Sequence, residues 1–371
     1  MNLKQGKIGI QEGVSLAAIS MITNALFTVD YDSCCKNGNS TYLTFPLAAL
    51  ISLALFLLAA SAIKKSGAED LTEFLILVFG RPGAAFAGIL LSFCLVWAAF
   101  LPLSRFVQAM HGLLYEGVSY LKLTMFILPV VLVLSLMGFE TIGRTAKCFS
   151  ILLLVIFFAV VLSAATGFET YRLYPILGNG AKEITMQSFM QTFAFLPAML
   201  SLLVMSGSLN GIRSAEKTGI IAILVSAAIC FIAQFTLGLV YTYTELRELF
   251  IPLYRLNHMN ILENSLMRLD KLSHMAWLNG SMIGGAFYIY SASVLFSRAF
   301  GLQDIRPAVN TNIMAALILI LMKFSGSFYK IAPLLTAMND YGFLIIAGIL
   351  SAAMLVLLIR SGRKTAEELK I

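Results

Sequence analysis

The chain has 371 residues, of which 59% are hydrophobic and 12% are charged. Soluble domains are about 45–50% apolar and about 25% charged, so this composition excludes a soluble globular fold. A helix needs about 20 residues to cross a hydrocarbon core about 30 Å thick, which leaves room for about ten crossings with short connections. Too little of the chain then remains for a separate catalytic domain.

The formal net charge is +7. Nucleic-acid binding would require the basic residues to gather on one face, whereas here they stand singly or in pairs between apolar runs. Membrane topology explains them better. Lys and Arg are more frequent on the side that holds both termini, so both termini are predicted to be cytoplasmic in a multi-pass membrane protein.

Ten apolar windows are predicted to cross the membrane. They cover residues 10–29, 44–63, 84–110, 123–139, 149–165, 188–205, 219–243, 273–299, 309–322 and 341–359. The first lacks a small-residue cleavage site and is therefore expected to be retained. The long outer connection 244–272 has leucines at three- and four-residue steps over 253–272, which predicts an amphipathic helix that acts as a lid or as a docking surface.

Ten spans divide into two sets of five, and an odd number per half inverts the second half. One transmembrane domain, residues 1–371, would then hold a first repeat (8–166), an outer connection (167–187), a second repeat (188–360) and a cytoplasmic tail (361–371). The first and sixth spans would correspond in this repeat, and both are polar. Paired polar, interrupted spans indicate discontinuous helices with a binding site at mid-membrane.

A small ligand is therefore expected between the first, third, sixth and eighth spans. The free N–H and C=O groups of a broken helix can bind a carboxylate and a cation. A carboxylate is expected near Ser20, Thr23 and Asn24, and a side-chain pocket near Trp97, Phe193 and Phe195. The remaining candidate ligand-binding residues are Gln191, Pro197, Ser281 and Tyr288. For each hydroxyl, the alternative is a bond to a carbonyl one turn back in its own helix.

Catalytic motifs are absent from the sequence. The three histidines, His111, His258 and His274, have no Cys or carboxylate at metal-ligand spacing. The sequence also lacks the GxSxG and HExxH patterns. We therefore expect neither an enzyme nor a resident cofactor or metal. No acidic residue stands at the centre of a span, which argues against a proton relay, whereas a sodium ion bound by carbonyl and hydroxyl oxygens stays open.

Several segments resemble one protein family. The run Tyr174-Pro175-Ile176-Leu177-Gly178-Asn179-Gly180 resembles the Pro-x-Leu-Gly-x-Gly signature of the permease-like B subunits of bacterial spore germinant receptors. The run from Phe300 to Pro307 is similar to the Phe-Gly-Leu-x-Asp-x-Arg sequence that ends their eighth span, and Trp277 precedes it as in that family. The sixth span departs from the family pattern, because Leu200 stands where an acidic residue is common.

The resemblance implies an all-α integral membrane protein of the amino acid–polyamine–organocation superfamily, with a LeuT-type inverted repeat. It implies a receptor subunit of the cell or inner spore membrane that works beside a larger A-type membrane subunit and a C-type lipoprotein. Such a subunit would sense a nutrient such as an amino acid and start germination. Two alternatives remain: a sodium- or proton-coupled amino acid transporter on the same fold, and a scaffold without a ligand.

Overall fold

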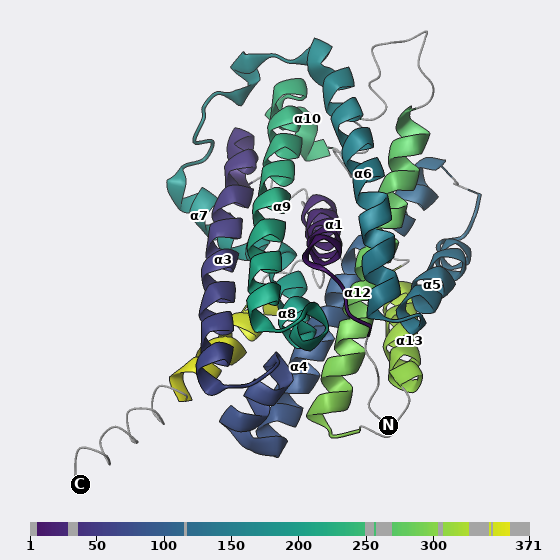
Figure 1. The fold of residues 1–371 in the computed structure, drawn as a ribbon. Coiled ribbons are helices and arrows are strands. Elements are labelled where there is room, and N and C mark those ends of the chain that lie inside the picture. Colours follow the sequence, from purple (N-terminus) through teal and green to yellow (C-terminus); the bar gives the residue numbers. More distant parts are fainter. Residues whose placement is uncertain are drawn as a thin grey trace, which may run out of the picture.

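The computed structural model describes residues 6–28, 36–114, 117–248, 256, 269–302, 307–325, 341–342 and 344–356, and within these ranges it is helical with no strand (Figure 1). The α-helices are α1 (Ile10–Thr28), α3 (Thr41–Ser66), α4 (Leu71–Ala109), α5 (Tyr120–Leu136), α6 (Phe139–Ala164), α7 (Ala181–Gln191), α8 (Leu196–Val204), α9 (Ile212–Val240), α10 (Tyr243–Glu248), α12 (Leu269–Ala299) and α13 (Pro307–Ser325). Short 3-10 turns are η1 (Gly38–Ser40), η3 (Ala165–Gly167), η4 (Thr170–Leu173), η5 (Thr192–Ala194) and η6 (Ser206–Leu209), and η2 (Met110–Leu114) is a π turn.

Several of these helices are long and apolar enough to cross a membrane. In the described part of the chain, five qualify by length and composition: Gly38–Ser66, Leu71–Gly112, Phe139–Gly167, Ala181–Val204 and Ile212–Val240. Shorter apolar helices cover Tyr120–Leu136, Asn310–Lys323 and Leu344–Val356. Together with α1 and α12, each overlaps one predicted span. The chain is therefore an all-helical, multi-pass membrane protein, while the count of ten spans and the inverted repeat remain predictions.

Helix ends differ from the predicted spans where charged turns extend a helix beyond its apolar part. Helix α4 begins at Leu71, well before the predicted residue 84, and bends at Gly80, whose φ is +74°. Asp70 caps this helix by accepting a hydrogen bond from the backbone N–H of Glu73 at 2.9 Å. The predicted helix over 253–272 lies mostly outside the described residues, and 269–272 belong to the first turns of α12.

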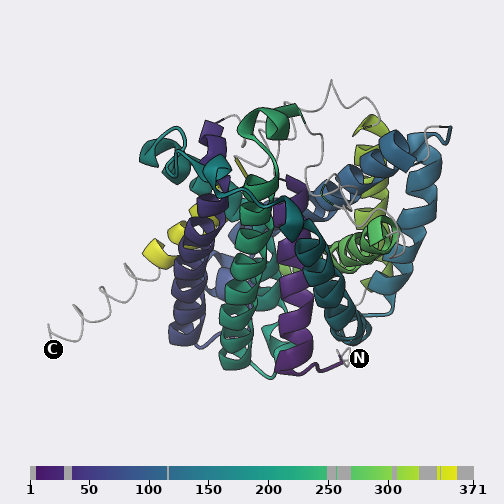
Figure 2. The same ribbon diagram turned by 90° about the horizontal axis from the view of Figure 1, so that it is seen from above.

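Helix α1 lies near the centre of the bundle. Figure 2 shows α3, α9, α1 and α6 side by side. Helix α12 packs against α1, α4, α5 and α6. From residue 16 to residue 26 every side chain of α1 is buried, including its hydroxyl and carboxamide groups. A helix that is buried on all sides must satisfy its polar side chains inside the protein, so α1 is where polar contacts carry most information.

The segment that carries the family-like signature contacts the residues that precede α3. The carboxamide of Asn39 donates to the carbonyl oxygen of Tyr174 at 2.6 Å. The carboxamide of Asn179 donates to the carbonyl oxygen of Lys36 at 2.7 Å. Gly178 has a φ of +50°, and the two segments approach most closely at this glycine. The signature thus fixes the position from which α7 starts.

We predict that Gly178→Ala destabilises the protein more than Gly301→Ala does. Both glycines have positive φ, which costs an alanine about 1–2 kcal/mol. At position 178 the added Cβ would also clash with the carbonyl oxygen of Asn37, whereas at position 301 it has nothing within 4 Å. Thermal unfolding in detergent should show a clearly lower Tm for Gly178→Ala. Equal shifts for the two variants would contradict this close approach.

Candidate functional site

The helical segment that covers the sixth predicted span, Ala181–Val204, is interrupted at mid-length. Helix α7 ends at Gln191, the 3-10 turn η5 follows, and α8 begins at Leu196. Pro197 lies in the first turn of α8, where its missing N–H costs no helical hydrogen bond. The hydroxyl of Thr192 donates to the carbonyl oxygen of Ser188 at 2.9 Å and so partly satisfies the end of α7. The interruption expected from Pro197 is present.

The first predicted span is not broken in the same way, because α1 is one continuous helix from Ile10 to Thr28. Two of its polar side chains form hydrogen bonds within their own helix. The hydroxyl of Ser20 donates to the carbonyl oxygen of Leu16 at 2.8 Å, and that of Thr23 donates to Ile19 at 2.9 Å. No Gly or Pro follows Gly13 inside α1, so the backbone ladder has no weak point. The expected discontinuity of this span is not present.

Helices α1 and α12 approach each other closely at two glycines. A Cβ on Gly284 would lie 3.3 Å from the Cα of Ser20, and one on Gly280 would lie 2.9 Å from the methyl group of Thr23. Small residues four apart let membrane helices pack backbone to backbone. This contact places Asn24 within reach of Tyr288, and the Asn24 carboxamide nitrogen donates to the Tyr288 hydroxyl at 3.1 Å.

The interface between α1 and α12 holds polar atoms without partners. Asn24 is 1% exposed, and the oxygen of its side-chain carboxamide accepts no hydrogen bond from any described residue. The hydroxyl of Ser281, on α12, is fully buried and equally without a partner in that part of the chain. Buried polar atoms are rarely left in this state, and each one costs about 1–3 kcal/mol. We call Ser20, Thr23, Asn24, Ser281 and Tyr288 the α1–α12 polar cluster.

Trp97 lies on α4, which packs against α12, α1 and α8. Its side chain is 2% exposed, and its ring contacts Phe100 and Phe93 with centroid distances of 5.1 and 6.2 Å. The indole N–H is buried and meets no acceptor among the residues described. Trp97 therefore brings a large apolar face and an unused donor to the core of the bundle.

The other predicted residues turn away from the polar cluster. The carboxamide oxygen of Gln191 accepts a hydrogen bond from Thr44 on α3, and Phe195 meets Phe45 of the same helix at a ring distance of 6.5 Å. Phe193 contacts Gly342 near the last described helix. Consecutive residues of a helix point about 100° apart. The positions of Gln191, Phe193 and Phe195 in the sequence therefore do not show which of them faces α1, because this depends on how the helix is rotated about its axis.

Two glycines at the centre of the contact between α1 and α12 were not predicted from the sequence. Gly280 and Gly284 were not singled out, although their GxxxG spacing is a known signal for close packing of membrane helices. Ser201 of α8 and Ser291 of α12 are fully buried with hydroxyls that find no partner in the described ranges. No sequence signal distinguishes these two serines from those that bond back to their own helices.

One end of the bundle is held by a contact that we call the Arg298 latch: Arg298, Asp70 and Val204. Arg298, at the end of α12, forms an ion pair with Asp70 before α4. Its guanidinium also donates to the carbonyl oxygen of Val204, at the end of α8, at 3.2 Å. Nearby, the Ser206 hydroxyl donates to the carbonyl oxygen of Glu69 at 2.6 Å. These contacts connect the end of α12, the end of α8 and the start of α4.

No group of three His, Cys, Asp or Glu side chains that could hold a metal ion occurs in the described ranges. Cys94 and Cys230 are buried and free, and Cys148 is exposed. Within that part of the protein the chemistry available at the site is therefore hydrogen bonding by carboxamide, hydroxyl and indole groups beside a broken helix.

Comparison with solved structures identifies the fold. A nucleobase-cation-symport-1 family transporter with bromovinylhydantoin bound matches 98% of this chain and 96% of its own, with 12% identity and a TM-score of 0.70. A sodium-coupled sialic acid symporter matches 94% of this chain and 78% of its own, with 13% identity and a TM-score of 0.65. A manganese transporter of Eremococcus coleocola matches 94% and 76%, with 11% identity and a TM-score of 0.62. The chain thus has the LeuT-type fold of membrane transporters.

The sequence itself matches one family model, described as spore germination protein, over residues 7–329. The chain therefore belongs to the spore germination permease family, as its signature segments indicated. A search of curated proteins finds no significant match. The protein thus combines the fold of membrane transporters with membership of a germination protein family.

We predict that Gly284→Val disrupts the contact between α1 and α12. The added side chain must displace the backbone of Ser20, and overpacking of this kind costs about 1–3 kcal/mol. Gly348→Val is the matched control, because a Cβ at Gly348 meets nothing within 4 Å. Thermal unfolding should show a lower Tm for Gly284→Val alone. An unchanged Tm would mean that the two helices can separate without cost.

We also predict that Arg298→Gln loosens the latched end. The variant loses the charge that Asp70 and the Val204 carbonyl share. Amide hydrogen exchange should become faster at residues 69–74 and 204–211, while it stays unchanged in the first half of α3, which begins at Thr41. Arg213→Gln, at an exposed position on α9, is the control. Equal exchange in both variants would show that the latch does not hold these segments.

Proposed function

We propose that this protein is the nutrient-sensing subunit of a spore germinant receptor. It binds a small polar ligand, such as an amino acid, at the α1–α12 polar cluster beside the break between α7 and α8. The observation that carries the proposal is the buried Asn24–Tyr288 pair with unpartnered oxygens on Asn24 and Ser281. A bound ligand would supply hydrogen-bond partners to these atoms, and membership of the germination family supports the biological role.

Sensing requires two packings of the bundle that differ in ligand affinity. The structure has α1 tight against α12, with the Arg298 latch tying α8 to α12 and α4. The turn at η5 lets α8 tilt independently of α7, so a ligand that separates α1 from α12 can shift the whole half-helix. The ligand can move this equilibrium only by its difference in affinity for the two packings.

The receptor assembly is part of the same proposal. The subunit works in the cell or inner spore membrane with both termini in the cytoplasm, beside a larger A-type membrane subunit and a C-type lipoprotein. It performs no catalysis of its own and needs no resident cofactor. The ligand's effect then reaches the partner subunits through the change in helix packing.

The second candidate is a cation-coupled amino acid transporter, and the fold favours it specifically, since one similar structure is a sodium-coupled symporter. No Asp or Glu is fully buried in the described residues, which disfavours a proton relay in the centre. Sodium needs only hydroxyl and carbonyl oxygens. Uptake of labelled amino acid into liposomes, driven by a sodium gradient, would favour transport, while binding without uptake would favour sensing.

We predict that Asn24→Ala weakens the response of spores to their nutrient. Loss of a buried hydrogen bond to a charged ligand group costs about 1.5–3 kcal/mol, which raises the half-effective nutrient concentration roughly 10- to 100-fold.

Ser226→Ala is the matched control for this substitution. Ser226 also contacts α1, at 3.4 Å from the carbonyl oxygen of Ala18, but it does so from α9, outside the polar cluster. Protein levels in the spore membrane are compared for both variants. An unchanged response of Asn24→Ala spores at equal protein level would refute the assignment of the site.

A further inference from the structure

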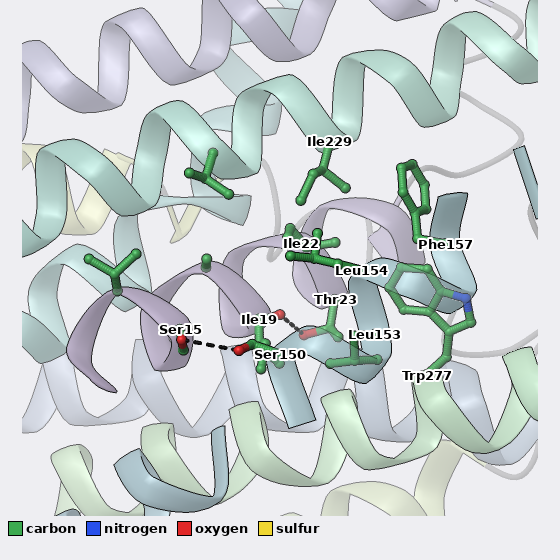
Figure 3. A pocket seen from close by; sticks show the side chains of 13 residues that line it. Ser15, Ile19, Ile22, Thr23, Ser150, Leu153, Leu154, Phe157, Ile229 and Trp277 are labelled. Carbon is green, nitrogen blue, oxygen red and sulfur yellow. Dashed lines mark hydrogen bonds between the residues drawn. The ribbon is translucent and has the colours of Figure 1, made fainter. Parts of the chain in front are cut away.

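A cavity of about 260 Å³ lies on the side of α1 that faces α6 and α9 (Figure 3). Its walls come from α1, α6, α9 and the start of α12. The lining residues are Val14, Ser15, Ala18, Ile19, Ile22, Thr23, Ser150, Leu153, Leu154, Phe157, Val225, Ile229 and Trp277. All of these residues lie inside their helices, at least four positions from either end.

The polar groups in this wall are already engaged. Ser15 donates to Ser150 at 3.3 Å, and Ser150 donates to the carbonyl oxygen of Lys147 at 2.8 Å. Thr23 is bonded to Ile19, as the dashed line in Figure 3 shows. The remaining wall is aliphatic and aromatic. A cavity of this kind stays dry and binds apolar molecules, so a polar nutrient gains nothing from it.

The helices that flank the cavity present apolar side chains to their surroundings. On α6, Ile151 is 69% exposed and Val155 is 61% exposed, and on α9, Leu224 is 56% exposed. In a membrane-spanning bundle, such faces meet hydrocarbon rather than water. Leu154 and Val225 belong both to the exposed faces and to the cavity wall, so the cavity is continuous with the lipid-facing surface.

Basic side chains stand at one end of the same two helices. Arg144 and Lys147 are exposed on α6, and Arg213 and Lys217 are exposed on α9. Lys147 is one turn from Ser150 in the wall, about 4.5 Å along the helix axis. Lys147 also pairs with Glu12 at 3.1 Å, and Arg144 pairs with Glu140, which leaves a net positive charge among these six groups. An anionic phospholipid has a negatively charged headgroup and apolar acyl chains, and this arrangement matches basic helix ends next to an apolar cavity.

We propose that the cavity between α1, α6 and α9 binds one acyl chain of an anionic phospholipid, whose headgroup lies at the basic ends of α6 and α9. The acyl chain contacts Ile19 and Thr23 of α1, which also pack against Gly280 of α12, while Ser20 and Asn24 meet Gly284 and Tyr288 further along α12. An acyl chain in this cavity therefore stabilises the observed position of α1 between α6, α9 and α12.

The two tryptophans of the chain allow a direct test. Trp277 lines the cavity, whereas Trp97 is buried elsewhere. The variant Trp97→Phe keeps only the cavity tryptophan, and Trp277→Phe keeps only the core one. Each is reconstituted in vesicles whose phosphatidylglycerol carries bromine atoms on its acyl chains, and fluorescence quenching is measured. We expect quenching at least about twofold stronger for Trp277, because bromine in the cavity contacts the ring directly.

A pair of neighbouring substitutions separates the cavity from the general lipid surface. In the Trp97→Phe background, Val225→Phe fills the cavity, whereas Leu224→Phe adds the same ring on the exposed side of α9. Val225→Phe should lower the quenching of Trp277 to the level of ordinary bilayer contact, and Leu224→Phe should leave it unchanged.

Four results would overturn the proposal. Equal quenching of both tryptophans would show that no acyl chain lies in the cavity. The same conclusion would follow if the two phenylalanine variants did not differ. Strong quenching of Trp277 by acrylamide instead of brominated lipid would make the cavity an aqueous space. Equal quenching by brominated phosphatidylcholine and phosphatidylglycerol at matched mole fraction would refute the anionic headgroup. None of these measurements depends on nutrient binding, so the proposed sensing function stands or falls separately.

Discussion

The structure depends above all on the close contact between α1 and α12. Gly280 and Gly284 remove the side chains that would hold the two helices apart, and the contact buries the Asn24–Tyr288 hydrogen bond. In a bilayer no hydrophobic force draws helices together, so close packing and polar contacts supply the association. The same contact leaves polar atoms of Asn24 and Ser281 without partners in the described residues, and this is the observation on which the proposed ligand site rests.

Helix α1 also connects the two binding surfaces argued above. The polar cluster faces α12, the apolar cavity faces α6 and α9, and Thr23 belongs to both. Because a buried helix moves as a rigid body, a change in occupancy on one side alters the packing on the other. The Arg298 latch adds a further constraint, since it joins α8 to α12 and to the start of α4. This protein thus combines a transporter fold with contacts that tie the ends of α4, α8 and α12 together.

Much of the fold could be predicted from the sequence, because the membrane imposes a strong rule on helix length and composition. The break in the sixth span could also be predicted, since Pro197 cannot continue a helical hydrogen-bond ladder. The prediction of a break in the first span was wrong, and the reason is equally local. Ser20 and Thr23 are polar, but their hydroxyls bond to carbonyls of their own helix, so polarity there did not mean an interruption.

The sequence by itself determined the class of the protein, its helices and its family signature, because apolar length and turn-forming glycines act locally. Only the tertiary structure decided that Asn24 meets Tyr288, that Gln191 and Phe195 face α3, and that an apolar cavity lies behind α1. These contacts join residues far apart in the chain, up to 264 positions for Asn24 and Tyr288. The rotation of each helix about its own axis selects them, and packing against neighbouring helices sets that rotation.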